Sequence, residues 1–149
     1  MTPNSILVPT DFSEFAEHAL DYACNLAGKL GATVHLVNAL GASLPELNIA
    51  MTDAMIEKLV VGHREALEKL ADTRRARARI GSVLVMSGDA RDVILEAAKT
   101  VGADLIVMGT HGRRGVARLM LGSVTENVLR HADCPVLAVR PKLAHKSKA

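Results

Sequence analysis

The chain is 149 residues long, 49% of them apolar and 23% charged, and this balance is typical of one globular domain and excludes a disordered chain. With two Phe, one Tyr and no Trp, it lacks the aromatic residues on which nucleic-acid-binding surfaces stack exposed bases. The net charge of +2 depends on the lysines in the last nine residues, PKLAHKSKA. We therefore expect one domain over residues 1–141, a basic tail over residues 142–149, and no nucleic-acid partner.

The sequence carries no sign of a targeting signal or of a metal-binding cluster. Its two cysteines, Cys24 and Cys134, are too few for a disulfide framework, and no Cys or His spacing matches a zinc site. Residues 3–5 lead directly into a short apolar run, unlike a signal peptide. The longest apolar runs are well below the roughly 18 residues that cross a bilayer. These features predict a cytoplasmic protein with no membrane partner.

Five short apolar runs, each bounded by turn residues, predict five β-strands. Apart from the second, they consist almost entirely of Val, Ile, Leu and Met, which is typical of strands covered on both faces in a parallel sheet. The expected strands are residues 6–9, 33–38, 83–86, 104–108 and 136–139.

The segments between these runs have the periodicity of amphipathic helices. The first apolar face runs over residues 16–30, with Ser13 or Asp11 as its expected N-terminal cap and Gly31 as a left-handed stop. The other helices are expected at residues 52–79, from Asp89 to near Gly102, and at residues 123–131. The second ends in a cluster of arginines that suits a helix C-terminus, at positions 74, 75, 77 and 79. Its apolar face is expected to contain Met55, Leu59, Ala66 and Leu70.

Strands that alternate with helices predict an open α/β fold, with a parallel five-stranded sheet, right-handed crossovers and helices on both faces. In such sheets ligands bind beyond the carboxyl ends of the strands, where the strand order reverses. The segments that follow the first, third and fourth strands are therefore the candidates for a site. They are residues 9–13, 87–89 and 109–127.

The last of these segments is rich in glycine. Gly109, Gly112 and Gly115 let backbone approach a ligand closely and point amides inward, while Gly122 and Ser123 open a helix whose free N–H groups favour phosphate. The same residues also fit a glycine-rich turn followed by an ordinary helix cap. Neither GxxxxGK[ST] nor a GxGxxG after the first strand is present, which argues against a P-loop and a dinucleotide site.

The spacing Gly-x2-Gly-x9-Gly-[Ser/Thr], carried by Gly109, Gly112, Gly122 and Ser123, resembles the ATP-binding motif of the universal stress protein family. Residues 6–13, 122–128 and 134–137 are also similar to segments of that family. The resemblance implies a Rossmann-like sheet of order 3-2-1-4-5 with its site between strands one and four. It also implies ATP with Mg²⁺ or Mn²⁺ as the ligand and a homodimer.

The resemblance further assigns expected roles to residues of this chain. Asp11 would meet the ribose or the metal-bound phosphates and is the one expected metal ligand, and Val37 would offer backbone groups to the adenine edge. The base and sugar would be lined by Pro9, Thr10 and Met108. The phosphates would be held by Gly109, Gly112, Gly122, Ser123, Val124 and Thr125. His111 and Arg113 either reach a phosphate or face solvent in the loop.

Two functions follow from this site. The first is a binding module that senses an adenine nucleotide and passes its state to an unidentified protein partner. The second is a slow ATPase that uses Mg²⁺ held by Asp11, although no second acid or water-positioning Gln is evident near the motif and no catalytic residue is assigned. A phosphoacceptor receiver domain is excluded, because Asp11 has no acidic partner after the first strand.

An oligomeric state also follows from the implied strand order. The last strand, residues 136–139, becomes an apolar edge of the sheet, and exposed edges invite pairing with another chain. A two-fold axis at this edge would join two sheets into a homodimer.

Overall fold

The computed structural model describes residues 2–41, 51–111 and 121–140. Strands and helices alternate along the whole of this part of the chain. The strands are β1 (Ser5–Pro9), β2 (Thr33–Leu40), β3 (Arg79–Ser87), β4 (Leu105–Gly109) and β5 (Val136–Val139). The helices are α1 (Glu14–Leu30), α2 (Asp53–Asp72), α3 (Ala90–Thr100) and α4 (Ser123–His131).

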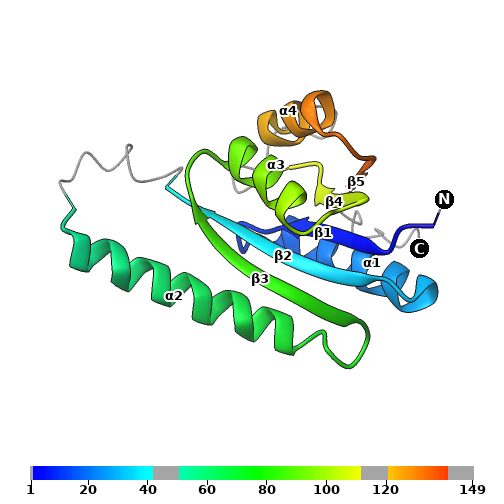
Figure 1. The fold of residues 1–149 in the computed structure, drawn as a ribbon, viewed down its shortest axis with the longest axis horizontal. Helices are drawn as coiled ribbons and strands as arrows, with labels where there is room; N and C mark the ends of the chain where they lie inside the picture. The colour runs from blue at the N-terminus through cyan, green and yellow to red at the C-terminus, as the bar shows by residue number, and fades with distance from the viewer. Residues whose placement is uncertain (1, 42–50, 112–120, 141–149) are drawn as a thin grey trace, which may run out of the picture.

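The five strands form one parallel sheet of order β3-β2-β1-β4-β5, as Figure 1 shows. The chain moves outward from β1 to β3 on one side and then crosses through α3 to β4 on the other side. The strand order therefore reverses between β1 and β4, at the position where open α/β sheets bind ligands. The predicted fold class is confirmed.

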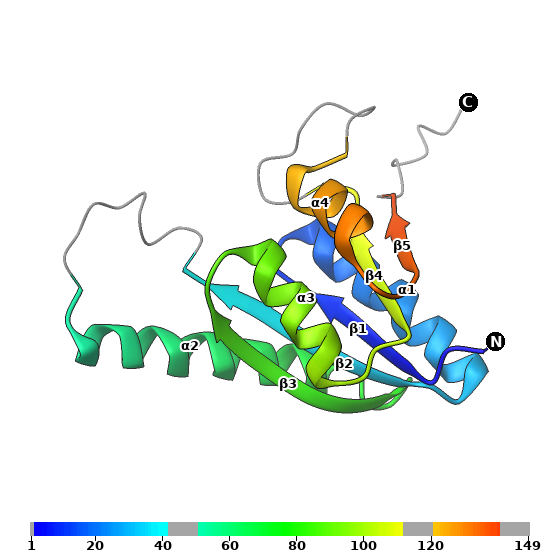
Figure 2. The same ribbon diagram turned by 45° about the horizontal axis from the view of Figure 1, so that its top comes forward.

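Helices cover both faces of the sheet and divide the core in two (Figure 2). Successive strand residues point to opposite faces, so Ile6 and Val8 pack under α1 and α2 while Leu7 packs under α3 and α4. All three of these side chains are fully buried. The central strands are thus covered on both sides, which explains why their sequences are almost continuously apolar.

Local signals at the ends of α1 act as expected. Ser13 caps the helix by accepting a hydrogen bond from Ala16 N, and Gly31 closes it in the left-handed conformation with φ of 70°. Asp11, the alternative cap, instead accepts a hydrogen bond from Ser13 N at 2.9 Å. It therefore stabilises the turn before the helix, and Ser13 is the cap.

Helix α2 differs from its prediction in length and in the face that it buries. It ends at Asp72, and Arg79 begins β3. Two of the arginines expected at the C-terminus of this helix lie beyond its end and are held by Asp21 of α1, because Arg74 and Arg77 donate to its carboxylate at 3.1 and 2.6 Å. The buried residues of the helix are Leu67, Leu70 and Ala71, whereas the expected Ala66 and Met55 are exposed.

His35 of β2 fills an irregularity in the pairing of β2 with β3. The register shifts between Val34 and Leu36, so that β3 contains one extra residue, and Ser82 N donates to His35 Nδ1 at 2.9 Å. A Cβ on Gly81 would lie 2.5 Å from the imidazole ring, so only glycine leaves room for it. Burial lowers the pKa of His35, because the charged ring would lose hydration.

We expect this arrangement to make folding stability dependent on pH. The folded protein favours the neutral ring, so the unfolded chain binds the proton first. Stability is therefore complete above the ordinary His pKa of 6.5 and falls as the pH drops below it. Urea unfolding at a series of pH values should show this loss, and the variant His35→Gln should show less of it. An identical pH profile in the two proteins would contradict the assignment.

Candidate nucleotide-binding site

The carboxyl ends of β1 and β4 separate at the point where the strand order reverses. The two strands pair only at Ile6↔Leu105 and Leu7↔Ile106, whereas β1 pairs with β2 along its whole length to Pro9↔Val37. The predicted site segments that follow β1 and β4 therefore emerge on either side of this opening. The N-terminus of α4 lies beside them, because Gly122 N donates to Thr110 O at 2.7 Å.

The turn after β1 is held by its own side chains. Phe12 N donates to Thr10 Oγ1 at 3.1 Å, and Ser13 N donates to the Asp11 carboxylate. Between these two bonds Phe12 adopts a φ of 64°, a left-handed conformation that costs a non-glycine residue roughly 1–3 kcal/mol. The half-buried Asp11 is thus presented at the opening by a strained turn, and strain of this kind is concentrated at functional sites.

Val37, expected to offer backbone groups to the adenine edge, has its carbonyl engaged within the protein. Its side chain is fully buried apart from 1% of its surface, and its carbonyl accepts a hydrogen bond from Thr10 N at 2.9 Å. Strand β2, however, continues beyond the last β1 pair to Leu40. Ala39, in this overhanging part, is half-buried and lies two residues closer to the opening. Its place near the opening follows only from the register of the strands, which the sequence does not specify.

The first glycine of the motif has a structural reason to be glycine. A Cβ on Gly109 would lie 3.2 Å from the carbonyl oxygen of Phe15 in α1, which is tighter than ordinary contact. The next two residues are also engaged with the protein, since Thr110 N donates to Val139 O and His111 Nδ1 lies 2.9 Å from Thr110 Oγ1. Gly109 therefore allows α1 to pack closely on β4, whatever else it does.

Gly122 does not need to be glycine for its backbone conformation. It is the N-terminal cap of α4, with φ of −58° and ψ of 149°, a conformation that any residue adopts. Side chains that cap a helix are preferred at this position, yet α4 has no side-chain cap hydrogen bond. The first N–H groups of α4 are thus left uncapped at the opening, together with the positive end of the helix dipole. This arrangement favours an anionic group such as a phosphate.

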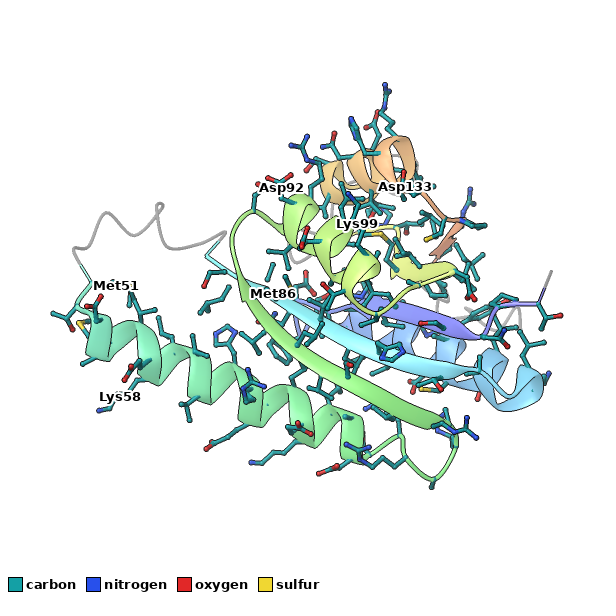
Figure 3. All side chains as sticks on the ribbon, viewed as in Figure 1. Met51, Lys58, Met86, Asp92, Lys99 and Asp133 are labelled. Carbon is teal, nitrogen blue, oxygen red and sulfur yellow. The ribbon has the colours of Figure 1, made fainter. Side chains whose placement is uncertain are left out.

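Three further predicted site residues follow Gly122 on α4. Thr125 is 3% exposed and its hydroxyl donates to Gly109 O at 2.8 Å, so its proton is used to join α4 to β4. The hydroxyl proton of Thr125 is thus engaged within the protein, and its role in holding a phosphate stays a prediction. Ser123 is exposed and Val124 half-buried. Both line a hollow of about 350 Å³ between the N-termini of α3 and α4, where Asp92 lies on the first turn of α3 (Figure 3).

Of the remaining predicted residues, the structure describes two and does not describe the other two. Pro9 is half-buried at the end of β1, and the Met108 side chain is 5% exposed and packs in the core under α3 and α4. Gly112 and Arg113 lie outside the described residues. Sequence analysis also missed two side chains behind the β1 turn, Asn38 and His63, whose contacts are described below.

Metal-binding clusters and membrane-spanning helices are both absent from the described ranges. No group of three or more His, Cys, Asp or Glu side chains there is arranged to hold a metal ion. Asp11 is the one acidic side chain that follows β1 directly, and Mg²⁺ is commonly held by a single carboxylate together with phosphates. In the same ranges, no helix has the length and apolar character that crossing a bilayer requires.

The doubly wound sheet, with its opening between β1 and β4 where the strand order reverses, defines a Rossmann-like α/β protein. The model of the universal stress protein family matches residues 3–140, and the chain belongs to that family. The universal stress protein MJ0531 of Methanocaldococcus jannaschii is 33% identical over 138 residues, covering 91% of this chain and 81% of the relative.

Solved structures show the same fold. The structure of protein MJ0577 from Methanocaldococcus jannaschii has a TM-score of 0.80 and 28% identity, covering 97% of this chain and 100% of that one. A universal stress protein from Archaeoglobus fulgidus, solved in complex with dAMP, has a TM-score of 0.64 and 27% identity, with coverages of 93% and 98%. These similarities confirm the family and the fold that the sequence predicted.

Proposed function

We propose that this protein is a regulatory binding module that holds ATP, with Mg²⁺, at the opening between β1 and β4. The observation that carries the proposal is Gly122, a cap without a side chain in a conformation that does not require glycine. The absence of a side chain leaves the α4 N–H groups accessible to a phosphate chain. A similar protein from Archaeoglobus fulgidus, solved with dAMP, supports an adenine nucleotide as the ligand.

Each part of the nucleotide has a candidate partner. The phosphates meet the N-terminus of α4 through the backbone of Gly122, Ser123 and Val124. Gly112 and Arg113, which lie outside the described residues, remain candidates from the motif alone. The ribose or the metal-bound phosphates meet Asp11. The adenine lies toward Pro9 and the overhanging end of β2, where the backbone of Ala39 replaces that of Val37 as the expected contact.

Binding without efficient hydrolysis fits the side chains nearby. Phosphoryl transfer to water is fastest when a positioned group orients the water. Glu126 is the acid in the first turn of α4. It is exposed, and its carboxylate is paired with Arg130 at 2.9 Å. Slow ATP hydrolysis with Asp11-held Mg²⁺ is the alternative, and phosphate release measured over hours on the purified protein separates it from simple binding.

Calorimetric titration tests the proposal directly. The protein, stripped of co-purified nucleotide, is titrated with ATP and Mg²⁺, and in parallel with GTP and with AMP. We expect ATP to bind with micromolar affinity, GTP more weakly because the base edge differs, and AMP more weakly because it lacks two phosphates. If none of the three binds, the proposal is wrong. If ATP and GTP bind equally well, the proposed contact with the adenine edge is wrong.

We also propose a homodimer formed through β5. This strand is the edge of the sheet and pairs only with β4 among the described strands. Its residues Val136, Leu137 and Ala138 are half-buried in one copy, and unpaired apolar edges favour association. The protein partner that would respond to the nucleotide is not identified by any residue described here.

A further inference from the structure

The turn that presents Asp11 is held from behind by a buried amide. Asn38 of β2 is 4% exposed, and its Nδ2 donates to Thr10 O at 2.9 Å. Thr10 is itself 5% exposed and starts the turn, since its hydroxyl accepts from Phe12 N. Asn38 therefore fixes the carbonyl of the residue just before Asp11.

His63 of α2 completes this arrangement. Its Nδ1 lies 2.8 Å from Asn38 Oδ1. Because the Asn38 NH₂ group already faces the carbonyl of Thr10, the oxygen must face His63, and an amide oxygen only accepts. Nδ1 of His63 therefore carries a proton and donates it. Without this donor, Asn38 Oδ1 would be a buried acceptor with no partner.

His63 also contacts the strained residue of the turn. Its ring meets the ring of Phe12 edge-on, with centroids 5.8 Å apart and an interplanar angle of 73°. Phe12 in turn packs against the core under α1 and α2. A non-glycine residue keeps a left-handed conformation only where its surroundings fix it, and His63 supplies one side of those surroundings.

We infer that His63 is a positioning residue of the nucleotide site, which acts through Asn38 and Phe12 to hold the turn bearing Asp11 and thereby couples helix α2 to the bound nucleotide. The inference rests on the proposed function. It goes beyond that function because α2 carries none of the ligand contacts proposed above. The chain of contacts is continuous, from His63 Nδ1 through the Asn38 amide to Thr10 O.

The position of His63 on α2 indicates which parts of the helix this coupling would connect to the site. The N-terminal end of the helix projects past the sheet, and Lys58, near that end, points away from the rest of the protein (Figures 1 and 3). The buried residues of α2, Leu67, Leu70 and Ala71, all lie on the other side of His63 in sequence. His63 thus lies in sequence between the part of α2 that holds these buried residues and residues 53–62, none of which is buried. Binding free energy shared between the site and α2 acts in both directions.

Two variants separate the hydrogen bond from the ring contact. His63→Phe keeps an aromatic ring beside Phe12 but removes the donor, so we expect the Kd for ATP to rise about fivefold or more. His63→Asn removes the ring but offers an amide Nδ2 at the position of the imidazole Nδ1, so we expect it to restore much of the affinity. Leu67→Val, in a fully buried position one turn along α2, is the stability control and should lower Tm without changing Kd.

Hydrogen exchange provides a readout that does not require ATP. The amides of Phe12 and Ser13 are held by Thr10 Oγ1 and Asp11 Oδ1. We expect them to exchange faster in His63→Phe than in the wild-type protein or in Leu67→Val, and to recover in His63→Asn. If the wild-type protein fails to bind ATP but this exchange pattern is found, the proposed ligand is wrong and the positioning role stands. If exchange and Kd in His63→Phe match those of Leu67→Val, the positioning role is overturned.

Discussion

Gly122→Val is expected to abolish ATP binding and leave the protein folded. The φ of −58° and ψ of 149° at this position are accessible to valine, so the backbone of α4 does not need to change. The isopropyl group, however, would lie at the helix N-terminus where a phosphate must approach the N–H groups. We expect an affinity loss of at least about a hundredfold, because the group blocks the backbone contacts and no side chain replaces them. Calorimetric titration with ATP and Mg²⁺ measures it.

Thr52→Val provides a matched control at another helix cap. Thr52 caps α2 by accepting a hydrogen bond from Met55 N at 3.2 Å, so its replacement removes a cap and should cost about 1 kcal/mol of stability. It introduces the same side chain at the N-terminus of a helix outside the site, and ATP binding should persist. Unchanged ATP affinity in Gly122→Val would show that α4 does not hold the phosphates, even though the family assignment stands.

The sheet could be predicted from sequence because its signals are local. Each central strand is a short apolar run, and the helices between them carry caps and stops such as Ser13 and Gly31. Once strands and helices alternate, right-handed crossovers leave few arrangements. The strand order itself came from the resemblance to a family, since no local pattern distinguishes β3 from β5 as neighbours of the central strands.

Helix α2 was predicted less well because its sequence pattern competes with tertiary contacts. Arginines at positions 74 and 77 are consistent with a longer helix, but they pair with Asp21 of α1 after the helix has ended. The N-terminal end of the helix projects past the sheet (Figure 1), and Met55, which fits the predicted apolar face, remains exposed. Periodicity indicates which face is apolar, and only the packing decides how much of that face is buried.

The candidate site was predicted at the level of segments and less well at the level of atoms. Residue types and spacing identified the ends of β1 and β4 and the start of α4. They did not indicate that the Thr125 hydroxyl is used by Gly109 O or that the Val37 carbonyl is used by Thr10 N. The link from His63 to Asn38 joins residues 25 positions apart, and nothing in either neighbourhood of the sequence indicates it. These are long-range hydrogen bonds, which depend on strand register and on how the helices pack against the sheet.

Ala138→Pro is expected to convert the proposed dimer into a monomer. Ile106 N and Thr110 N of the β4 segment donate to the carbonyls of Pro135 and Val139, so alternate residues of β5 face β4 and those between them, Val136 and Ala138, face outward. Proline at 138 therefore removes an outward N–H and leaves the β4 ladder intact. Light scattering should show the mass fall from about twice 15.8 kDa to that of one chain.

The choice of position 138 makes this prediction specific for the interface. Leu137, the residue before it, faces β4, so Leu137→Pro would break the sheet itself and its effect on mass could not be interpreted. Ala138→Val, which keeps the N–H and favours a strand, is the control and should remain dimeric. Ala138→Pro should still bind ATP, because the contacts beside the N-terminus of α4 are made by Val139 O and Thr110. A dimeric Ala138→Pro protein would mean that the two copies meet elsewhere, and a monomeric wild-type protein would remove the dimer altogether.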